Sequence, residues 1–122
     1  MTDAAAEIDP RLLEILVRRS EHTLAIAFDD GASFVLPAEY LRVMTGSALD
    51  RGHGEERPPV AGKQGVGMAE ITPIGRYAVR IRFDDGHDTG LYSWDALYDL
   101  GREQPAKWGK YLADLEKYGL KR

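Results

Sequence analysis

The sequence predicts one α+β domain, built mainly from antiparallel β-hairpins with two or three short helices. Three features support this prediction: the length, a repeated hairpin motif, and the helical spacing that follows it. The 122 residues are 43% hydrophobic and 30% charged, as expected for a single globular domain. A chain of this length buries roughly two-thirds of its unfolded surface, which is enough for a core without disulfides or structural metal.

The repeated motif occupies Leu24–Gly31 and Val79–Gly86, and each copy ends in Phe-Asp-Asp-Gly. Each copy is typical of a strand that enters a turn. A three-residue Asp-Asp-Gly loop would place Gly31 and Gly86 at the left-handed backbone position, which favours a residue without a Cβ.

That loop length predicts a register for each hairpin. In the first, Ile26 lies opposite Phe34 and Leu24 opposite Leu36, with all four side chains on one face. In the second, the same loop predicts three pairs on one face and an opposite-charge pair on the other: Phe83 with His87, Ile81 with Thr89, Val79 with Leu91, and Arg82 with Asp88.

A helix start follows each hairpin, so the repeated unit is a hairpin and then a helix. Pro37 suits the first turn of a helix from Pro37 to about Val43. Ser93 suits the N-cap of a helix over residues 94–100, with Gly101 just past its end. A third helix is predicted from apolar residues at helical spacing, followed by a glycine stop: Trp108, Tyr111, Leu112, Leu115 and Tyr118, then Gly119.

Three further segments complete the organisation. Residues 1–10 lack the basic and apolar regions of a secretory signal, and we expect a disordered lead there. Residues 11–122 then form the single domain. Within it, residues 46–65 are rich in glycine and proline and are predicted to form a long surface loop. Residues 66–83 are predicted to form another hairpin, which turns at Thr72–Gly75.

Composition excludes several classes of function. Twenty acidic against sixteen basic residues give a net charge of −4, which argues against a dedicated nucleic-acid binder. The absence of cysteine excludes disulfides, thiolate catalysis and Cys-based zinc or iron–sulfur sites in this chain. No apolar stretch approaches the roughly 20 residues that span a bilayer. We therefore expect a cytoplasmic protein with neither nucleic-acid nor membrane partners.

Two histidines are the best candidates for polar chemistry. His53 lies in a glycine-flanked stretch, and His87 follows the second Asp-Asp-Gly, beside Asp85 and Asp88. An imidazole near carboxylates can bind a metal or move protons near neutral pH. Each histidine also has a plain structural interpretation, as a packed or a solvated residue.

Other motifs favour structural interpretations. Gly62–Gly67 contains a lysine among glycines, but it lacks the spacing and the Ser or Thr of a phosphate-binding loop, so we interpret it as a flexible connection. Tyr92, Trp94 and Tyr98 could bind a cation, although aromatic residues at such spacing usually pack into the core. No serine lies in the strand–turn–helix context of a catalytic nucleophile.

Several segments together resemble one known family. They are Leu36–Arg42, Arg51–Gly54, Ile74–Val79 and above all Phe83–Trp94, which reads FDDGHDTGLYSW. These segments are similar to the gamma-butyrobetaine hydroxylase-like N-terminal domain family, and the resemblance spans roughly Ile15–Gly119.

The resemblance implies that the domain has a role in protein assembly rather than in catalysis. In carnitine-pathway dioxygenases the similar domain precedes the catalytic iron and 2-oxoglutarate barrel, and it binds a structural zinc through three cysteines and one histidine. Here the cysteine positions fall near Thr45, Ser47 and Asp50, and only the histidine, His87, remains. Because thiolates supply most of the strength of such a site, we expect no zinc and no other cofactor. A similar domain is also fused to P-loop ATPases that carry iron–sulfur clusters, which suggests a role in cluster assembly.

Three hypotheses follow. The first is a non-catalytic adaptor that recognises a protein partner and could form a homodimer. In this hypothesis the partner belongs to iron–sulfur cluster assembly or to the 2-oxoglutarate oxygenases. Its predicted surface comprises Arg51, His53, Asp85, His87, Asp88, Tyr92 and Trp94. The second is a small ligand- or metal-binding protein, which requires His53 to approach His87. The third is a free-standing enzyme, for which the sequence offers neither a nucleophile nor a complete metal set.

Overall fold

Two three-stranded antiparallel sheets and three helices form the domain. The structure is a computed structural model that describes residues 12–50, 59–86 and 90–122, and side chains in the same ranges apart from 45–50. The predicted α+β class is therefore confirmed. The disordered lead predicted for residues 1–10 lies outside the described residues. No helix in the described ranges is long and apolar enough to cross a bilayer.

The first sheet has the strand order β1-β2-β3, and a helix follows it. A short 3-10 turn connects its first two strands. The elements are β1 (Leu12–Arg18), the turn η2 (Arg19–Glu21), β2 (Thr23–Phe28), β3 (Ser33–Pro37) and α1 (Ala38–Asp50).

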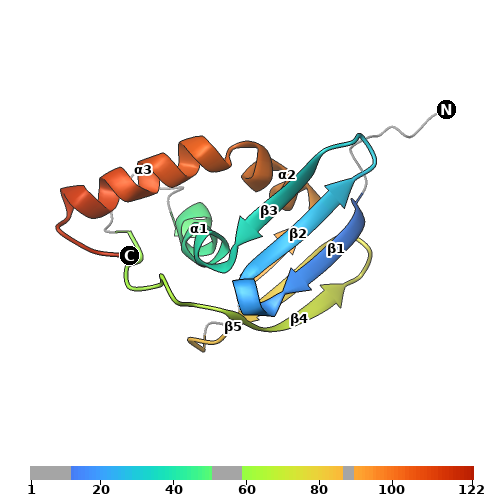
Figure 1. Ribbon diagram of the computed structural model, residues 1–122, viewed down its shortest axis with the longest axis horizontal. Coiled ribbons are helices and arrows are strands. Elements are labelled where there is room, and N and C mark those ends of the chain that lie inside the picture. The colour runs from blue at the N-terminus through green and yellow to red at the C-terminus, as the bar shows by residue number, and fades with distance from the viewer. Residues whose placement is uncertain (1–11, 51–58, 87–89) are drawn as a thin grey trace.

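The second sheet repeats this plan with the order β4-β5-β6, followed by two helices. Its elements are β4 (Met68–Ile74), β5 (Ala78–Phe83), β6 (Gly90–Ser93), α2 (Trp94–Arg102) and α3 (Gln104–Lys117). In Figure 1 the first sheet lies in the foreground on the right, with β4 and β5 below and behind it, and α1 and α3 lie to the left.

The repeated unit is larger than the sequence predicts. It consists of three strands and a helix rather than a hairpin and a helix, because β1 and β4 each add an outer strand. The two copies also share an irregularity. The register of β1 shifts just after the residue opposite Phe28, and the register of β4 shifts just after the residue opposite Phe83. Since Phe28 and Phe83 occupy the same place in the repeated motif, the two bulges mark equivalent positions of the unit.

The predicted register is confirmed in the first hairpin and wrong in the second. Ile26 pairs with Phe34 and Leu24 with Leu36, as the three-residue loop requires. In the second hairpin Val79 lies opposite Tyr92 instead of Leu91, a displacement of one residue. The predicted partners His87, Asp88 and Thr89 lie outside the described residues.

The displacement arises because the connection in the second hairpin is one residue longer than that in the first. Residues 82–89 separate the paired Ile81 and Gly90, one residue more than residues 27–33, which separate Ile26 from Phe34. A one-residue slip moves each side chain of a strand to the other face. It therefore turns Tyr92 inward and Leu91 outward. Gly31 and Gly86 nevertheless both have the predicted positive φ, at 90° and 94°.

Several boundaries also differ from the prediction. Pro37 ends β3, and α1 runs from Ala38 to Asp50, so residues 46–50 are helical and the long loop does not begin at Gly46. The β4–β5 hairpin turns later than Thr72–Gly75, since Ile74 still pairs with Ala78. Gly101 lies inside α2 rather than beyond it.

Two helix predictions are confirmed. The Ser93 hydroxyl accepts a hydrogen bond from the backbone N–H of Ala96 at 3.0 Å, which makes Ser93 the N-cap of α2. The third helix ends at Lys117, and Gly119 follows with a φ of 69°.

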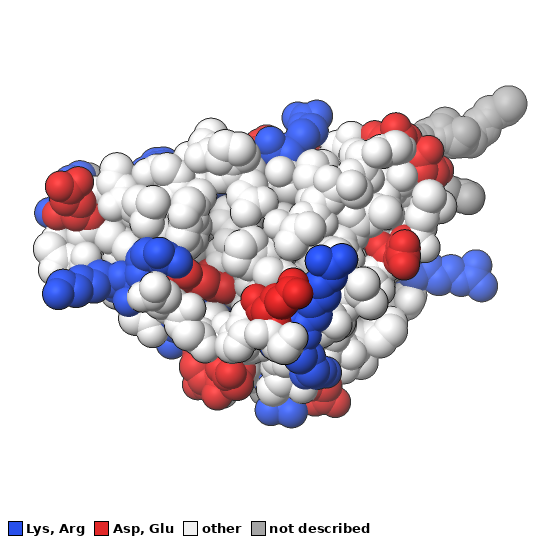
Figure 2. All heavy atoms as spheres, viewed as in Figure 1, with Lys and Arg blue, Asp and Glu red and all other residues white. Residues whose placement is uncertain are grey.

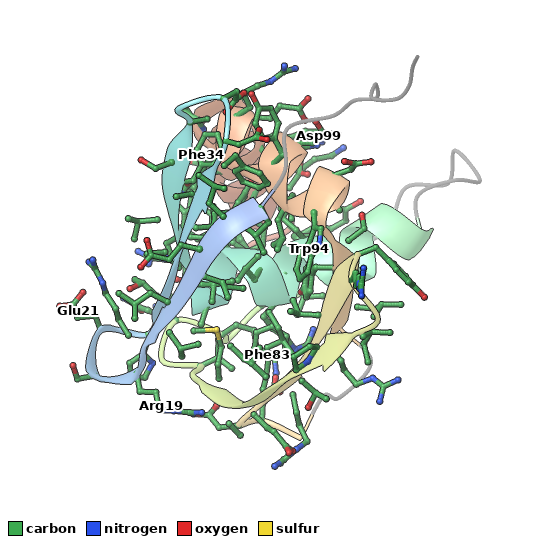
Figure 3. All side chains as sticks on the ribbon, turned by 90° about the vertical axis from the view of Figure 1, so that its right-hand side faces the viewer. Arg19, Glu21, Phe34, Phe83, Trp94 and Asp99 are labelled. Carbon is green, nitrogen blue, oxygen red and sulfur yellow. The ribbon has the colours of Figure 1, made fainter. Side chains whose placement is uncertain are left out.

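The core lies between the inner faces of the two sheets and the helices. Each sheet contributes alternate residues to it, as the period of a strand requires. The main buried side chains are Leu24, Ile26, Phe28, Leu36, Val79, Ile81, Phe83 and Tyr92 from the sheets, and Tyr40, Leu41 and Leu97 from the helices. Figure 3 shows Phe83 close to the second sheet and Phe34 in the upper part of the view, near α2.

Candidate interaction surface

Asp85 is the one residue of the predicted hairpin-tip cluster that the structure describes. Its carboxylate accepts a hydrogen bond from Arg42 Nε at 3.0 Å and forms an ion pair with Lys63 Nζ. The three residues come from the β5–β6 connection, from α1 and from the glycine-rich segment. All three side chains are mostly covered. Asp85 therefore fastens the hairpin tip to two distant parts of the chain.

The same contacts decide how the glycine-rich segment is used. The Lys63 ammonium faces Asp85, and the backbone N–H of Val66 donates to the Lys63 carbonyl at 3.0 Å. The lysine of the rejected phosphate-loop motif is thus held by a carboxylate of the same chain. Sequence analysis did not single out Arg42, because only the folded chain brings α1 beside the hairpin tip.

His22 takes part in a close approach between the two repeats. It has a φ of 57° after the turn η2, and its Nδ1 lies 3.0 Å from the carbonyl oxygen of Val66. Because a carbonyl only accepts, Nδ1 carries the proton in this contact. The next residue, Gly67, lies close to two side chains: a Cβ there would lie 2.9 Å from Asp84 Oδ2 and 3.2 Å from His22 Nδ1.

Arg19 forms a second connection at this place. Its Nη1 donates to the carbonyl oxygen of Met68 at 2.6 Å and to that of Ala69 at 3.2 Å. Figure 3 shows the Arg19 side chain extending from the turn after β1 toward β4. Arg19 and His22 therefore join the first sheet to the start of the second.

The structure corrects the predicted surface position of Tyr92 and places Trp94 at the margin of the core. Tyr92 is 3% exposed, and its hydroxyl donates to the carbonyl oxygen of Leu41 at 2.6 Å. Trp94 packs against the core, and its Nε1 donates to the carbonyl oxygen of Arg76 at 2.6 Å. Tyr92 is therefore buried and supplies no surface, whereas Trp94 is half-buried and held by its hydrogen bond. The one-residue change of register explains the inward orientation of Tyr92.

Tyr98, the third aromatic residue of that group, also has a structural role. Its ring packs edge-on against Phe28 and Phe34, with centroids 4.9 and 5.6 Å apart. Its hydroxyl donates to Asp30 Oδ2 at 2.6 Å. This hydrogen bond lowers the pKa of Asp30 and raises that of Tyr98. Asp30 also accepts from the N–H of Ala32, so it shapes the first hairpin loop.

A different surface takes the place of the buried aromatic residues. The second-sheet outer face consists of Glu70, Thr72, Arg80, Arg82 and Leu91. Across it, Arg80 lies between Thr72 and Leu91, and Arg82 lies opposite Glu70. Leu91 is 55% exposed because the register turns it outward. The Arg-Ile-Arg alternation of β5 is the sequence signal that could have indicated this face.

The electrostatics of this face contrast with the chain as a whole. Two arginines and one glutamate lie on it, whereas the whole chain carries a net charge of −4. Arg82 Nε and Nη2 both lie 3.2 Å from Glu70 Oε1. Since both of these side chains are exposed, the ion pair adds little stability and is easily exchanged for another carboxylate.

Four of the predicted surface residues lie outside the described residues: Arg51, His53, His87 and Asp88. The backbone at Thr45, Ser47 and Asp50 belongs to α1. In the described part of the chain, no three side chains of the metal-binding types gather at one place. The alternative metal or ligand site at His53 and His87 therefore stays a prediction.

Comparisons with known proteins match this fold to one family. The model of the family described as gamma-butyrobetaine hydroxylase-like, N-terminal, matches residues 15–98. Two solution NMR structures are similar, each with a TM-score of 0.78. The first is 43% identical in sequence, and the match covers 100% of this chain and 90% of the other chain. The second is 39% identical, and the match covers 93% of this chain and 90% of the other chain.

A crystal structure from Acidithiobacillus ferrooxidans is similar as well. It is described as a protein of unknown function of the DUF971 family, is 33% identical, and has a TM-score of 0.64. The match covers 77% of this chain and 98% of that one. Comparison with curated proteins gives no match.

Proposed function

Because this chain belongs to the gamma-butyrobetaine hydroxylase-like N-terminal domain family, we propose that it is a non-catalytic accessory domain that binds a protein partner. The binding surface in this proposal is the second-sheet outer face. The observation that carries it is the outward Leu91 beside Arg80, on a face whose five named residues are all exposed. Exposed apolar area flanked by arginine is typical of protein interfaces.

The chemistry of the face defines the partner. Leu91 offers apolar area that a partner side chain covers, and each arginine offers a planar set of donors that matches a carboxylate. Arg82 exchanges its exposed contact with Glu70 for a partner carboxylate at little cost. The partner surface is therefore acidic with an apolar centre. The net negative charge of the chain supports a protein partner over nucleic acid.

A finer proposal concerns the pathway. The resemblance to domains fused to iron–sulfur ATPases and to 2-oxoglutarate oxygenases supports a partner in cluster assembly or in oxygenase assembly. Identification of the captured protein decides between these two.

The experiment is affinity capture from native lysate with three forms of the full chain. The test variant is R80Q/L91T, which removes one cation and one exposed leucine and keeps residues that suit a strand. The control variant is K110Q/L112Q, which likewise removes one cation and one leucine, from the exposed side of α3. Circular dichroism and thermal melting establish that all three are folded.

We expect one protein to be captured by the wild type and by K110Q/L112Q and to be lost with R80Q/L91T. Equal capture by all three forms would contradict the proposed surface. Loss with both variants would point to a requirement for overall charge rather than for this face.

A further inference from the structure

The first strand, β1, has an edge that no described segment uses. β1 is the outer strand of the first sheet, and its inner edge pairs with β2. Within the described ranges, no backbone–backbone hydrogen bond joins β1 to any element besides β2. The free edge of β4 carries Pro73, which blocks strand addition, whereas β1 contains no proline and no lysine.

The backbone groups that face this free edge can be assigned. The N–H of Phe28 donates to the carbonyl of Ala32 at 2.8 Å, and the carbonyl of Phe28 accepts from the N–H of Gly31 at 3.1 Å, so the backbone polar groups of Phe28 face the β3 side of β2. This direction alternates along a strand, so the backbone polar groups of Ala25 face the other side, toward Leu16 of β1. Ile15 and Val17, the neighbours of Leu16, therefore direct their N–H and C=O groups to the free edge.

The outer face beside this edge is apolar. Leu16, Ala25 and Val35 form a cross-strand row over β1, β2 and β3, and Leu16 and Val35 are 47% and 49% exposed. Leu13 is 67% exposed at the bulge of the same strand. Figure 2 shows an uncharged surface over β3 and the upper part of β2, with charged side chains below it and around its margin.

The charges of β1 complement themselves. Glu14, Leu16 and Arg18 share the outer face, two residues apart. If two copies of β1 pair antiparallel about Leu16, each Glu14 lies opposite the other copy's Arg18, and the two Leu16 side chains meet. Ile15 then lies opposite Val17, and these are the residues with free backbone groups. Pairing about Ile15 or Val17 instead places a charge opposite a leucine.

We propose that this chain forms a twofold symmetric homodimer through antiparallel pairing of β1 with β1 of a second copy, centred on Leu16. The two first sheets become one six-stranded sheet. The row of Leu16, Ala25 and Val35 continues across the axis into the same row of the second copy. Arg18 exchanges its exposed contact with Glu21, at 3.9 Å, for Glu14 of the other copy.

A second copy fits this edge better than an unrelated partner. In a twofold interface each residue contacts its own complement on an identical surface. β1 supplies every required complement within five residues: the acid, the base, the central leucine and the two backbone donors and acceptors. The edge lies apart from the second-sheet outer face, so this inference does not depend on the proposed function.

Sedimentation equilibrium of the full chain, from about 1 µM to about 1 mM, measures the dimer. E14R and R18E each create two like-charge pairs and are expected to weaken the dimer at least about tenfold. The charge swap E14R/R18E recreates both pairs in reverse and is expected to restore wild-type association. K107E, which reverses a charge on the exposed side of α3, is expected to leave it unchanged.

Crosslinking tests the centre of the interface independently. The chain has no cysteine, so L16C introduces one thiol per copy. Leu16 residues on the axis form a non-hydrogen-bonded pair with Cα atoms about 4.5 Å apart, within disulfide range. We expect oxidised L16C to form a covalent dimer and the equally exposed V35C to stay monomeric.

A wild-type chain that is monomeric over the whole concentration range would overturn the proposal. A charge swap that fails to restore association would overturn the register, and so would equal crosslinking of L16C and V35C. If a single charge variant fails to fold, the two cysteine variants still decide the question.

Discussion

Arg122 holds the buried carboxylate of Glu39 through two hydrogen bonds. Its Nη2 donates to Oε1 at 2.8 Å and its Nε to Oε2 at 3.0 Å, and its guanidinium lies over the ring of Trp108 at 5.3 Å. Glu39 is 6% exposed at the start of α1. The hydrogen bonds to Glu39 raise the pKa of Arg122. The pair therefore ties the C-terminal segment to the first repeat.

Removal of this contact is expected to destabilise the fold. R122A leaves a buried carboxylate without its partner, which lowers the free energy of unfolding by about 1–3 kcal/mol. Urea denaturation measures the change. Adding E39Q to R122A places a neutral amide at the site and is expected to recover part of the loss. A loss below about 0.5 kcal/mol would contradict a stabilising role for the pair.

Two glycines in helices predict opposite effects of alanine. A Cβ at Gly101 would lie 2.3 Å from Cγ of Phe34, whereas a Cβ at Gly109 meets nothing within 4 Å. G101A is expected to lower the free energy of unfolding by about 1–3 kcal/mol through overpacking, despite the better helix propensity of alanine. G109A is expected to raise it by about 1 kcal/mol. Equal effects in urea denaturation would show that α2 does not pack this closely on β3.

These glycines also show why sequence analysis misplaced the end of α2. A glycine after an apolar helical pattern usually marks a helix stop, and Gly119 is such a stop. Gly101 has the same local sequence signal, but it is required because Phe34 of β3 packs against it. That contact is between residues far apart in the chain, and local patterns carry no information about it.

The two hairpins show the same limit. Both copies of the motif contain Asp-Asp-Gly, and the loop length inferred from it was correct for Ile26 and Phe34. In the second copy Leu91 and Tyr92 are both apolar, so alternation alone permits either to face the core. The hydrogen bond from the Tyr92 hydroxyl to Leu41 of α1 favours the observed register, and only the fold brings that carbonyl within reach.

Tyr92 provides a test of that account. Y92F removes the buried hydrogen bond to the Leu41 carbonyl and keeps the ring, so we expect a loss of about 1 kcal/mol in the free energy of unfolding. Partner capture is expected to remain at the wild-type level, because the side chain lies inside the core. Loss of capture with an unchanged stability would restore Tyr92 to the surface predicted from the sequence.

Tyr40 is expected to make the free energy of unfolding depend on pH in the alkaline range. Burial raises the pKa of Tyr40 from 10.0 to about 12, and its hydroxyl donates to the carbonyl of Leu100 at 2.7 Å. A raised pKa means that the folded state holds the proton more tightly than the unfolded state. The stabilisation is therefore complete below pH 10 and decreases as the pH rises from 10 to about 12. Thermal melting of the wild type and of Y40F measures it, and a parallel alkaline decline in both would contradict the assignment to Tyr40.

The family zinc site is expected to be lost in this chain. Thr45, Ser47 and Asp50 stand near the cysteine positions that the resemblance implies, and these side chains bind zinc far more weakly than thiolates. Elemental analysis of protein purified without chelators is expected to show zinc well below one atom per chain. Stoichiometric zinc that disappears in H87A would support the metal-binding alternative instead.

The most direct test of the proposed function is photocrosslinking at position 91. A photoreactive amino acid replaces Leu91 on the second-sheet outer face in one form of the protein and Leu112 on α3 in another, and both are irradiated in native lysate. We expect a crosslink to one acidic protein from position 91 and none to that protein from position 112. A crosslink from position 112 alone, or the same products from both positions, would contradict the claim that this face binds the partner.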